Sequence, residues 1–365
     1  MSRRLFAGRS LAVASGGVLS LYSKNSTASG NEMKATIPSI GTDGEGINVP
    51  AHFVPTPRTI SPQAQAFLSH VSPVELMALP SSRDDKAGWH AYAEAGNRGM
   101  IAMTAKYAER YPARVITHRL SAASLYEVTP HNLAPANATR AILYIHGGGF
   151  VVGGGQAASY AAMQMAGLAQ TRTFSIDYRM PPDYPFPVPL DDTVEAYRFL
   201  LGKFEPQNIA IFGPSAGANL APACILKARD LGLPLPAACA MHSCPSDATE
   251  LGDTSYTNDT VDIVLKHRSP GLSELYAGGH DPKDPLLSPR LADFSKGFPP
   301  TILTSGTRDL LLSGTVMLHR ALRRGGIKAE LHVWEAMTHA PFFDAPEETE
   351  LYNEHIQFML GHMGS

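Results

Sequence analysis

"IFGPSAGANL", residues 211–220, places one serine between two glycines where an apolar run gives way to a helical pattern. The run "NIAIFG" (208–213) predicts a buried strand, and "ANLAPACILKARDLG" (218–232) predicts a helix. A sharp turn between them would hold Ser215 in a strained conformation, with its hydroxyl exposed at the edge of a sheet. Gly213 and Gly217 would leave room for that turn. We therefore predict that Ser215 is a nucleophile, against the alternative of an ordinary strand–helix turn.

Working outward from this turn, apolar strand-like runs alternate with helical patterns from residue 141 to the end of the chain. Such alternation predicts an α/β fold, with a mainly parallel central sheet covered by helices on both faces. Two further strand-like runs, "RVITHRL" and "SLYEVTP", precede the series. The expected strands are 114–120, 124–130, 141–145, 173–178, 208–213, 237–243, 300–306 and 329–335. Ligands of such sheets bind at the carboxyl ends of the strands, which is where Ser215 is placed.

Two residues that could activate Ser215 follow later strands. Asp309 comes after "PTILTSG" (300–306), and His339 comes after "AELHVWE" (329–335). A serine hydroxyl needs a base to remove its proton, and the base needs an acid to orient it. The order Ser, Asp, His is the chain order of the nucleophile-elbow fold. We predict Ser215, Asp309 and His339 as catalytic residues; the alternatives are a helix N-cap for Asp309 and a surface position for His339.

The glycine-rich run "HGGGFVVGGG", residues 146–155, follows the strand at 141–145. Acyl transfer passes through a tetrahedral oxyanion that needs preorganised N–H donors. We predict that the amides of Gly148, Gly149 and Ala216 form an oxyanion hole, and that His146 and Gly147 support the loop. A nucleotide site is disfavoured, because the glycines fit a dinucleotide fingerprint only loosely. No spacing typical of metal ligands is found, so we expect no metal and no other cofactor.

Composition excludes several other classes of function. The 365 residues are 44% hydrophobic and 17% charged, with a net charge of −3 and no basic stripe, so we expect no nucleic-acid partner. No apolar stretch reaches the length of about 18 residues that a membrane span needs. Cys224, Cys239 and Cys244 are too few for a disulfide scaffold and are expected to be buried. A small-molecule substrate is the expected partner, and a homodimer is compatible with the sequence.

The N-terminal part differs from the rest of the chain. Arg3 and Arg4 precede a mildly apolar segment and a small-residue cleavage pattern at 26–28, so residues 1–28 resemble a twin-arginine export signal. Such a signal predicts an exported, periplasmic protein; the alternative is a disordered basic tail on a cytoplasmic protein. Residues 29–60 are predicted to form a linker or arm, and 61–111 a helical cap. The rest, 112–365, is predicted to be the catalytic domain, with an insertion at about 245–298 that adds to the cap.

Together these motifs resemble those of the hormone-sensitive-lipase-like (bacterial family IV) esterases of the α/β-hydrolase superfamily. The matching stretches are "HGGGF" (146–150), "DYRMPPDYPFPVPLDD" (177–192), "GPSAGANL" (213–220), "SGTRDLLL" (305–312) and "THAPF" (338–342). The resemblance implies a cofactor-free serine carboxylic-ester hydrolase that acts through an acyl-enzyme, with N-terminal helices covering the acyl pocket. A confined pocket of this kind implies short-chain or small-molecule esters, with lactones included.

The sequence departs from this family pattern at two positions. Pro214 stands where an acidic residue often precedes the nucleophile, and Ser313 stands where a second Asp commonly follows the acid. Both departures bear on pH optimum and loop stability, but neither removes a predicted catalytic residue. An acyltransferase or amidase using the same three residues remains open, as does a non-catalytic small-molecule-binding relative.

Overall fold

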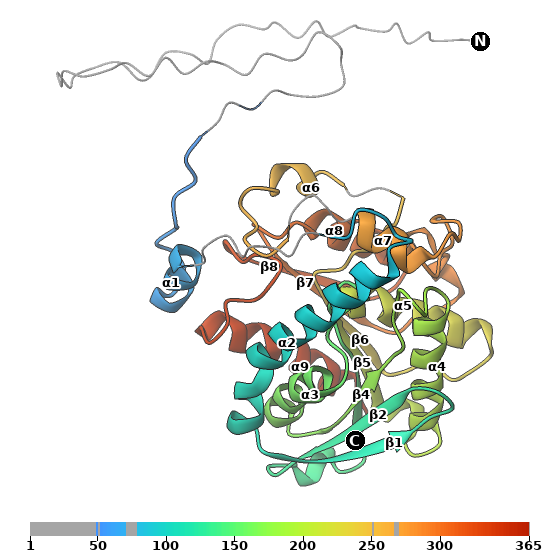
Figure 1. The fold of residues 1–365 in the computed structure, drawn as a ribbon. Helices are drawn as coiled ribbons and strands as arrows, with labels where there is room; N and C mark the ends of the chain where they lie inside the picture. The colour runs from blue at the N-terminus through green and yellow to red at the C-terminus, as the bar shows by residue number, and fades with distance from the viewer. Residues whose placement is uncertain (1–48, 50–51, 71–78, 250–251, 266–269, 365) are drawn as a thin grey trace, which may run out of the picture. The chain divides into compact units, whose positions relative to one another are not determined.

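The structure is a computed structural model that describes residues 49, 52–70, 79–249, 252–265 and 270–364 (Figure 1). The chain divides into two compact units, Met1–Phe53 and Val54–Ser365, and almost all of the first lies outside the described residues. The predicted export signal, 1–28, and most of the predicted arm, 29–60, therefore lie outside them too. The fold is that of the second unit, Val54–Ser365.

An eight-stranded sheet forms the centre of this unit, in the order β1-β2-β4-β3-β5-β6-β7-β8. Strand β2 is antiparallel to both of its neighbours, and all pairings from β4 to β8 are parallel. The predicted mainly parallel α/β sheet is thus confirmed. The strands are β1 (Ala113–Arg119), β2 (Ser124–Pro130), β3 (Ala141–Ile145), β4 (Arg172–Asp177), β5 (Ile209–Pro214), β6 (Ala238–His242), β7 (Thr301–Gly306) and β8 (Ala329–Trp334).

Helices cover both faces of the sheet, as Figure 1 shows. Helices α3 (Gln156–Ala169) and α9 (Pro346–His362) pack on one face, and α4 (Val188–Leu201), α5 (Ala216–Asp230) and α8 (Leu312–Arg324) pack on the other. Successive strand residues point to opposite faces, so Ile142 and Tyr144 join the core beneath α3 and α9, while Leu143 and Ile145 join the core beneath α4 and α5. Burial on both faces explains why β3 and β5 are apolar nearly throughout.

The predicted cap region, 61–111, contains helices α1 (Pro62–His70) and α2 (Lys86–Arg110); residues 71–78 are outside the described set. Asp85 begins α2 by accepting a hydrogen bond from the Gly88 amide at 2.9 Å. Near its end, the Tyr107 hydroxyl donates to Glu348 of α9 at 2.9 Å, and Gln164 of α3 donates to the same oxygen at 3.1 Å. The Tyr107 bond attaches α2 to α9, and the Gln164 bond joins α3 to the same carboxylate. That α1 and α2 cap an acyl pocket stays a prediction.

Between β6 and β7 the chain is mostly irregular, as the sequence predicted for 245–298. It carries the short helices α6 (Thr254–Thr257) and α7 (Pro270–Ala277) and the 3₁₀ turns η3 (Pro289–Leu291) and η4 (Phe294–Lys296). Buried Asp247 pairs with Arg290 and so closes this segment on itself. Two more 3₁₀ turns, η1 (Pro135–Asn137) and η2 (Pro206–Asn208), precede β3 and β5.

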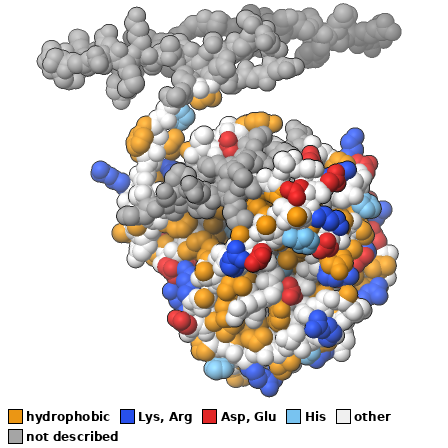
Figure 2. Space-filling view, in the orientation of Figure 1, with side chains coloured by type: hydrophobic (Ala, Val, Ile, Leu, Met, Phe, Trp, Pro, Cys, Tyr) orange, Lys and Arg blue, Asp and Glu red, His pale blue; other side chains and the backbone are white. Residues whose placement is uncertain are grey.

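The surface carries charges of both signs. On the face drawn in Figure 2, Lys and Arg side chains are interspersed with Asp and Glu over the described residues. Mixed charges of this kind create only weak long-range fields. Among the described helices, none combines the length and the apolar character that crossing a membrane would require.

Candidate active site

Ser215 lies at the turn between β5 and α5, with φ 54° and ψ −121°. Its amide donates to the carbonyl of His242 in β6 at 2.8 Å, which fixes the turn to the neighbouring strand. The turn is crowded on both sides: a Cβ on Gly213 would lie 2.3 Å from the Gly217 carbonyl oxygen, and a Cβ on Gly217 would lie 1.9 Å from that of Ile145. Only glycine fits at these two positions, as the sequence predicted.

His339 lies in the loop that follows β8, and its ring faces Ser215. Its Nε2 atom is 2.9 Å from the Ser215 hydroxyl oxygen, which is hydrogen-bonding distance. The side chain is only 10% exposed, so the alternative of a surface histidine is wrong. A histidine in this position can accept the serine proton through Nε2.

Asp309 follows β7 and is fully buried, with Oδ1 3.5 Å from His339 Nδ1. The Ser305 hydroxyl donates to Oδ2 at 2.5 Å, and the Leu311 amide donates to Oδ1 at 2.9 Å. Helix α8 begins after Leu311, its N-cap residue, so Asp309 lies just before the helix and binds the amide of that residue. The structure thus brings the three predicted residues together from the ends of β5, β7 and β8.

The surroundings of Asp309 and His339 favour an ionised Asp309 carboxylate and raise the basicity of His339. Burial alone would raise the pKa of Asp309, but hydrogen bonds from His339, Ser243 and Ser305 hold it below its ordinary value. Burial alone would lower the pKa of His339, but the hydrogen bond and charge of Asp309 raise it above its ordinary value. An ionised Asp309 therefore stabilises a protonated His339, as a general base requires when it has taken a proton.

The glycine-rich loop after β3 lies beside Ser215. A Cβ on Gly147 would lie 3.0 Å from the Pro214 carbonyl oxygen and 3.2 Å from the Ser215 Cβ, so there is little room for a side chain here. Gly148 and Gly149 have φ of 109° and 60°, values that favour glycine, and the Gly148 carbonyl accepts the amides of Val151 and Val152 at 3.1 and 3.0 Å. The Gly148 carbonyl is therefore hydrogen-bonded within the loop itself. The use of the Gly148, Gly149 and Ala216 amides as oxyanion donors stays a prediction.

His146 braces this loop. Its ring stacks on Tyr178 with centroids 4.1 Å apart, and its Nδ1 atom lies 2.8 Å from the Gly147 carbonyl oxygen. The Tyr178 hydroxyl in turn donates to the His146 carbonyl at 3.0 Å. Burial lowers the pKa of His146, so the ring is neutral at pH 7. These contacts agree with a supporting position for His146.

The structure shows the hydrogen bonds around the two positions, Pro214 and Ser313, that depart from the family pattern. Pro214 ends β5, and the hydrogen bond to β6 is made instead by the next amide, that of Ser215. The Ser313 hydroxyl accepts from the Thr254 amide at 3.0 Å, while the Thr254 hydroxyl accepts from the Ser313 amide at 2.9 Å. This reciprocal pair joins α8 to α6 directly behind the Asp309 loop.

Two residues near the site were missed by the sequence analysis. Ser243 follows β6, and its hydroxyl oxygen lies 2.5 Å from His339 Nδ1. Asp262 comes from the irregular segment between β6 and β7, and its Oδ2 atom accepts the amides of Leu310 and His339 at 2.8 and 3.2 Å. Ser243 could have been noted as a polar residue at the end of a strand. No pattern in the sequence marks Asp262.

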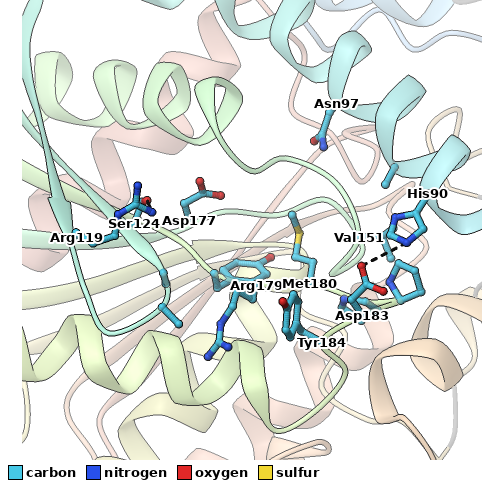
Figure 3. A pocket seen from close by; sticks show the side chains of 16 residues that line it. His90, Asn97, Arg119, Ser124, Val151, Asp177, Arg179, Met180, Asp183 and Tyr184 are labelled. Atoms are coloured by element: carbon cyan, nitrogen blue, oxygen red, sulfur yellow. Dashed lines mark hydrogen bonds and ion pairs between the residues drawn. The ribbon is translucent and has the colours of Figure 1, made fainter. Parts of the chain in front are cut away.

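A cavity of about 370 Å³ lies between α2 and the loop 177–184 (Figure 3). His90 and Asp183 pair across its rim at 3.3 Å, and Val151 of the glycine-rich loop also lines it. Ser215, Asp309 and His339 are not among its lining residues. The cavity is therefore separate from the cluster of the three predicted residues. Nor do the described residues contain a group of His, Cys, Asp or Glu that could hold a metal ion.

Comparison with known proteins decides the family. A profile described as the alpha/beta hydrolase fold matches residues 142–343, more than half of the chain. The chain belongs to the α/β-hydrolase family. A crystal structure of an esterase, E25, matches this α/β-hydrolase with a TM-score of 0.80 at 33% identity, over 87% of this chain and 99% of the other.

Further relatives place this α/β-hydrolase in the hormone-sensitive-lipase-like branch. An esterase from the bacterial hormone-sensitive lipase family matches with a TM-score of 0.71 at 28% identity, over 83% of this chain and 99% of the other. An acetyl-hydrolase from Streptomyces hygroscopicus is 33% identical over 202 residues, 55% of this chain and 67% of the relative. The resemblance stated from the motifs is thus confirmed.

Proposed function

We propose that this α/β-hydrolase is a serine carboxylesterase in which Ser215, His339 and Asp309 form a catalytic triad. The observation that carries the proposal is the 2.9 Å contact between Ser215 Oγ and His339 Nε2 at a strained strand–helix turn. Strain of this kind persists where the surrounding structure enforces it, and it gathers at active sites. Membership of a branch whose relatives are named esterases supports the same reaction.

The proposed mechanism has two acyl-transfer steps. His339 Nε2 takes the proton of Ser215 as Oγ attacks the ester carbonyl, and Asp309 stabilises the imidazolium that forms. The amides of Gly148, Gly149 and Ala216 receive the oxyanion. His339 then gives its proton to the leaving alkoxide, which leaves an acyl group on Ser215. Water, deprotonated by His339, attacks this acyl-enzyme and releases the carboxylic acid.

We propose short-chain or small-molecule esters as the substrates. One relative is named an acetyl-hydrolase, and one solved structure at 27% identity is of a protein soaked with p-nitrophenyl butyrate. Each CH₂ group that fits in a pocket gains about 0.8 kcal/mol, but only while there is room for it. Across a series of p-nitrophenyl esters, kcat/KM should therefore peak at acyl chains of roughly two to six carbons. A steady rise through twelve to sixteen carbons would indicate a lipase instead.

The triad is tested by single substitutions. Ser215→Ala and His339→Ala should each lower kcat for p-nitrophenyl acetate by about 10³-fold or more. Ser295→Ala is the matched control, because Ser295 is exposed in η4 and bonds only to Asp293 of its own turn among the contacts of the described residues. Circular dichroism of each variant checks the fold. Near-normal turnover by a folded Ser215→Ala protein would refute the assignment.

A further inference from the structure

Ser243 occupies an unusual backbone position beside the proposed triad. It is the first residue after β6, it is fully buried, and its φ is 53°. Its amide donates to the Thr304 carbonyl of β7 at 2.8 Å, so its backbone is held by the sheet. A non-glycine residue in the left-handed region is strained, and such strain gathers at functional sites.

The side chain of Ser243 is closer to the base than the acid is. Its Oγ atom lies 2.5 Å from His339 Nδ1, whereas the nearest recorded approach of Asp309, through Oδ1, is 3.5 Å. The direct hydrogen bond between Asp309 and His339 is therefore long, whereas the contact of Ser243 with the ring is short. The same hydroxyl is also, after His339, one of the groups that lower the pKa of Asp309, whereas burial raises it. The Ser243 hydroxyl therefore contacts the base directly and lowers the pKa of the acid.

We propose that Ser243 is a positioning residue of the triad, whose hydroxyl accepts the Nδ1–H of His339 and donates its own proton to Asp309. The proposal rests on the triad assigned above. A hydroxyl is suited to this position because it donates and accepts at once, whereas an ionised carboxylate only accepts. The charge of Asp309 thus reaches the imidazole partly through the hydroxyl.

No proton is transferred along this connection. When His339 takes the Ser215 proton at Nε2, the ring becomes charged, and the hydrogen bond from Nδ1–H to the Ser243 oxygen strengthens. The Ser243 proton stays on its own oxygen. Ser243 holds the tautomer of His339 with hydrogen on Nδ1, which leaves Nε2 free to act as the base. The other Asp309 oxygen is already engaged by Ser305.

Other ionisable groups also face His339 and contribute to its titration. Asp309 faces Nδ1, and Asp262 accepts the His339 amide and helps to raise the pKa of the ring. His242 of β6 lies with Nε2 3.2 Å from the His339 carbonyl oxygen, and burial lowers the pKa of His242 to about 4. His242 is therefore neutral above pH 5. Of the groups that contact Nδ1, Ser243 can be changed without altering a charge.

The experiment compares pH profiles of kcat for Ser243→Ala and for the wild type. Removing the hydroxyl weakens the coupling between Asp309 and the imidazolium, so kcat should fall about 10-fold to 100-fold, less than the roughly 10⁴-fold loss expected when the acid itself is replaced. The acid limb of the profile should move to lower pH, because the protonated ring is less stabilised. KM should change by less than about threefold, since Ser243 does not touch the substrate.

Two further variants separate the hydroxyl from packing and strain. Ser246→Ala is the matched control: Ser246 is also fully buried in this segment, and its hydroxyl donates to the Gly314 carbonyl at 2.7 Å, away from His339. It should leave the acid limb unchanged. Ser243→Gly also lacks the hydroxyl but relieves the positive φ, so it should fold readily and shift the acid limb as Ser243→Ala does.

Each outcome is decisive for Ser243. A kcat for Ser243→Ala within twofold of the wild type, or an acid limb that does not move, would overturn the proposal. So would a near-normal Ser243→Gly beside a weakened Ser243→Ala, because backbone strain would then explain the loss. The triad assignment is tested separately from the Ser243 proposal. Activity retained by Ser215→Ala would refute the triad. An inactive Ser215→Ala protein beside a normal Ser243→Ala protein would refute only the proposal for Ser243.

Discussion

Replacing Gly217 by alanine should separate the two halves of the proposed active site. Gly217 is the second residue of α5, where the helix approaches the end of β3 most closely. A Cβ there would lie 1.9 Å from the Ile145 carbonyl oxygen and 3.0 Å from that of His146. Both contacts are to backbone, which cannot move aside as a flexible side chain could.

The size of the effect follows from that overlap. Ordinary van der Waals contact begins at 3.4 Å, so α5 and the end of β3 must separate by about 1.5 Å. This shift would carry the loop of Gly147–Gly149 away from Ser215. A misplacement of about 1 Å can cost on the order of 10²-fold in rate. We therefore expect kcat/KM to fall by about 10²-fold or more, which corresponds to ~2.7 kcal/mol.

The assay is kcat/KM for p-nitrophenyl acetate together with the thermal midpoint of unfolding. Overpacking of this kind costs about 1–3 kcal/mol, so the variant should still fold. Gly361→Ala is the matched control, because Gly361 lies exposed on α9 and an added Cβ would meet nothing within 4 Å. It should gain up to about 1 kcal/mol of stability and keep full activity. A folded Gly217→Ala enzyme with kcat/KM within threefold of the wild type would refute the reasoning.

Three other predictions test the electrostatics, the cap and the N-terminus. His339 must be neutral to accept the Ser215 proton, and Asp309 raises the pKa of His339 above the ordinary 6.5. The value of kcat/KM should therefore rise with pH through a midpoint above about 6.5, and Asp309→Asn should move that midpoint to lower pH. Tyr107→Phe removes the bond to buried Glu348 and should lower the free energy of unfolding in urea by about 1–3 kcal/mol, against less than about 0.5 kcal/mol for the exposed Tyr184→Phe. We also propose export, so intact mass should place the mature N-terminus near Ser29; native protein that begins at Met1 or Ser2 and is recovered from cytosol would contradict it.

Local patterns in the sequence predicted the sheet and the nucleophile turn. The strands are short runs between turn residues, and β3, β5, β6 and β7 are buried on both faces, so their composition reveals them. The turn at Ser215 was predictable because only glycine fits on either side, a constraint that acts within a few residues. Asp309 and His339 could be chosen because parallel strands bring their carboxyl ends to one edge of the sheet.

The contacts that refine this arrangement were not predictable, because they join segments far apart in the chain. Ser243 bonds to His339, 96 positions away, and Asp262 bonds to the amide of the same histidine, 77 positions away. Ser243 ends the predicted strand 237–243 but stands in no motif, and Asp262 stands in neither a motif nor a periodic pattern. Their partners are known only once the loops are packed.

Asp262 shows why strand order alone does not make the site. The sheet places the loops after β7 and β8 at the same edge, but their side chains must meet within hydrogen-bonding distance, a far narrower tolerance. One oxygen of Asp262 accepts the amide of Leu310, next to Asp309, and also the amide of His339 itself. Its other oxygen accepts the amides of Val264 and Leu265 and so fixes the carboxylate. A single buried side chain from a third segment thus holds the loop of the acid against the loop of the base.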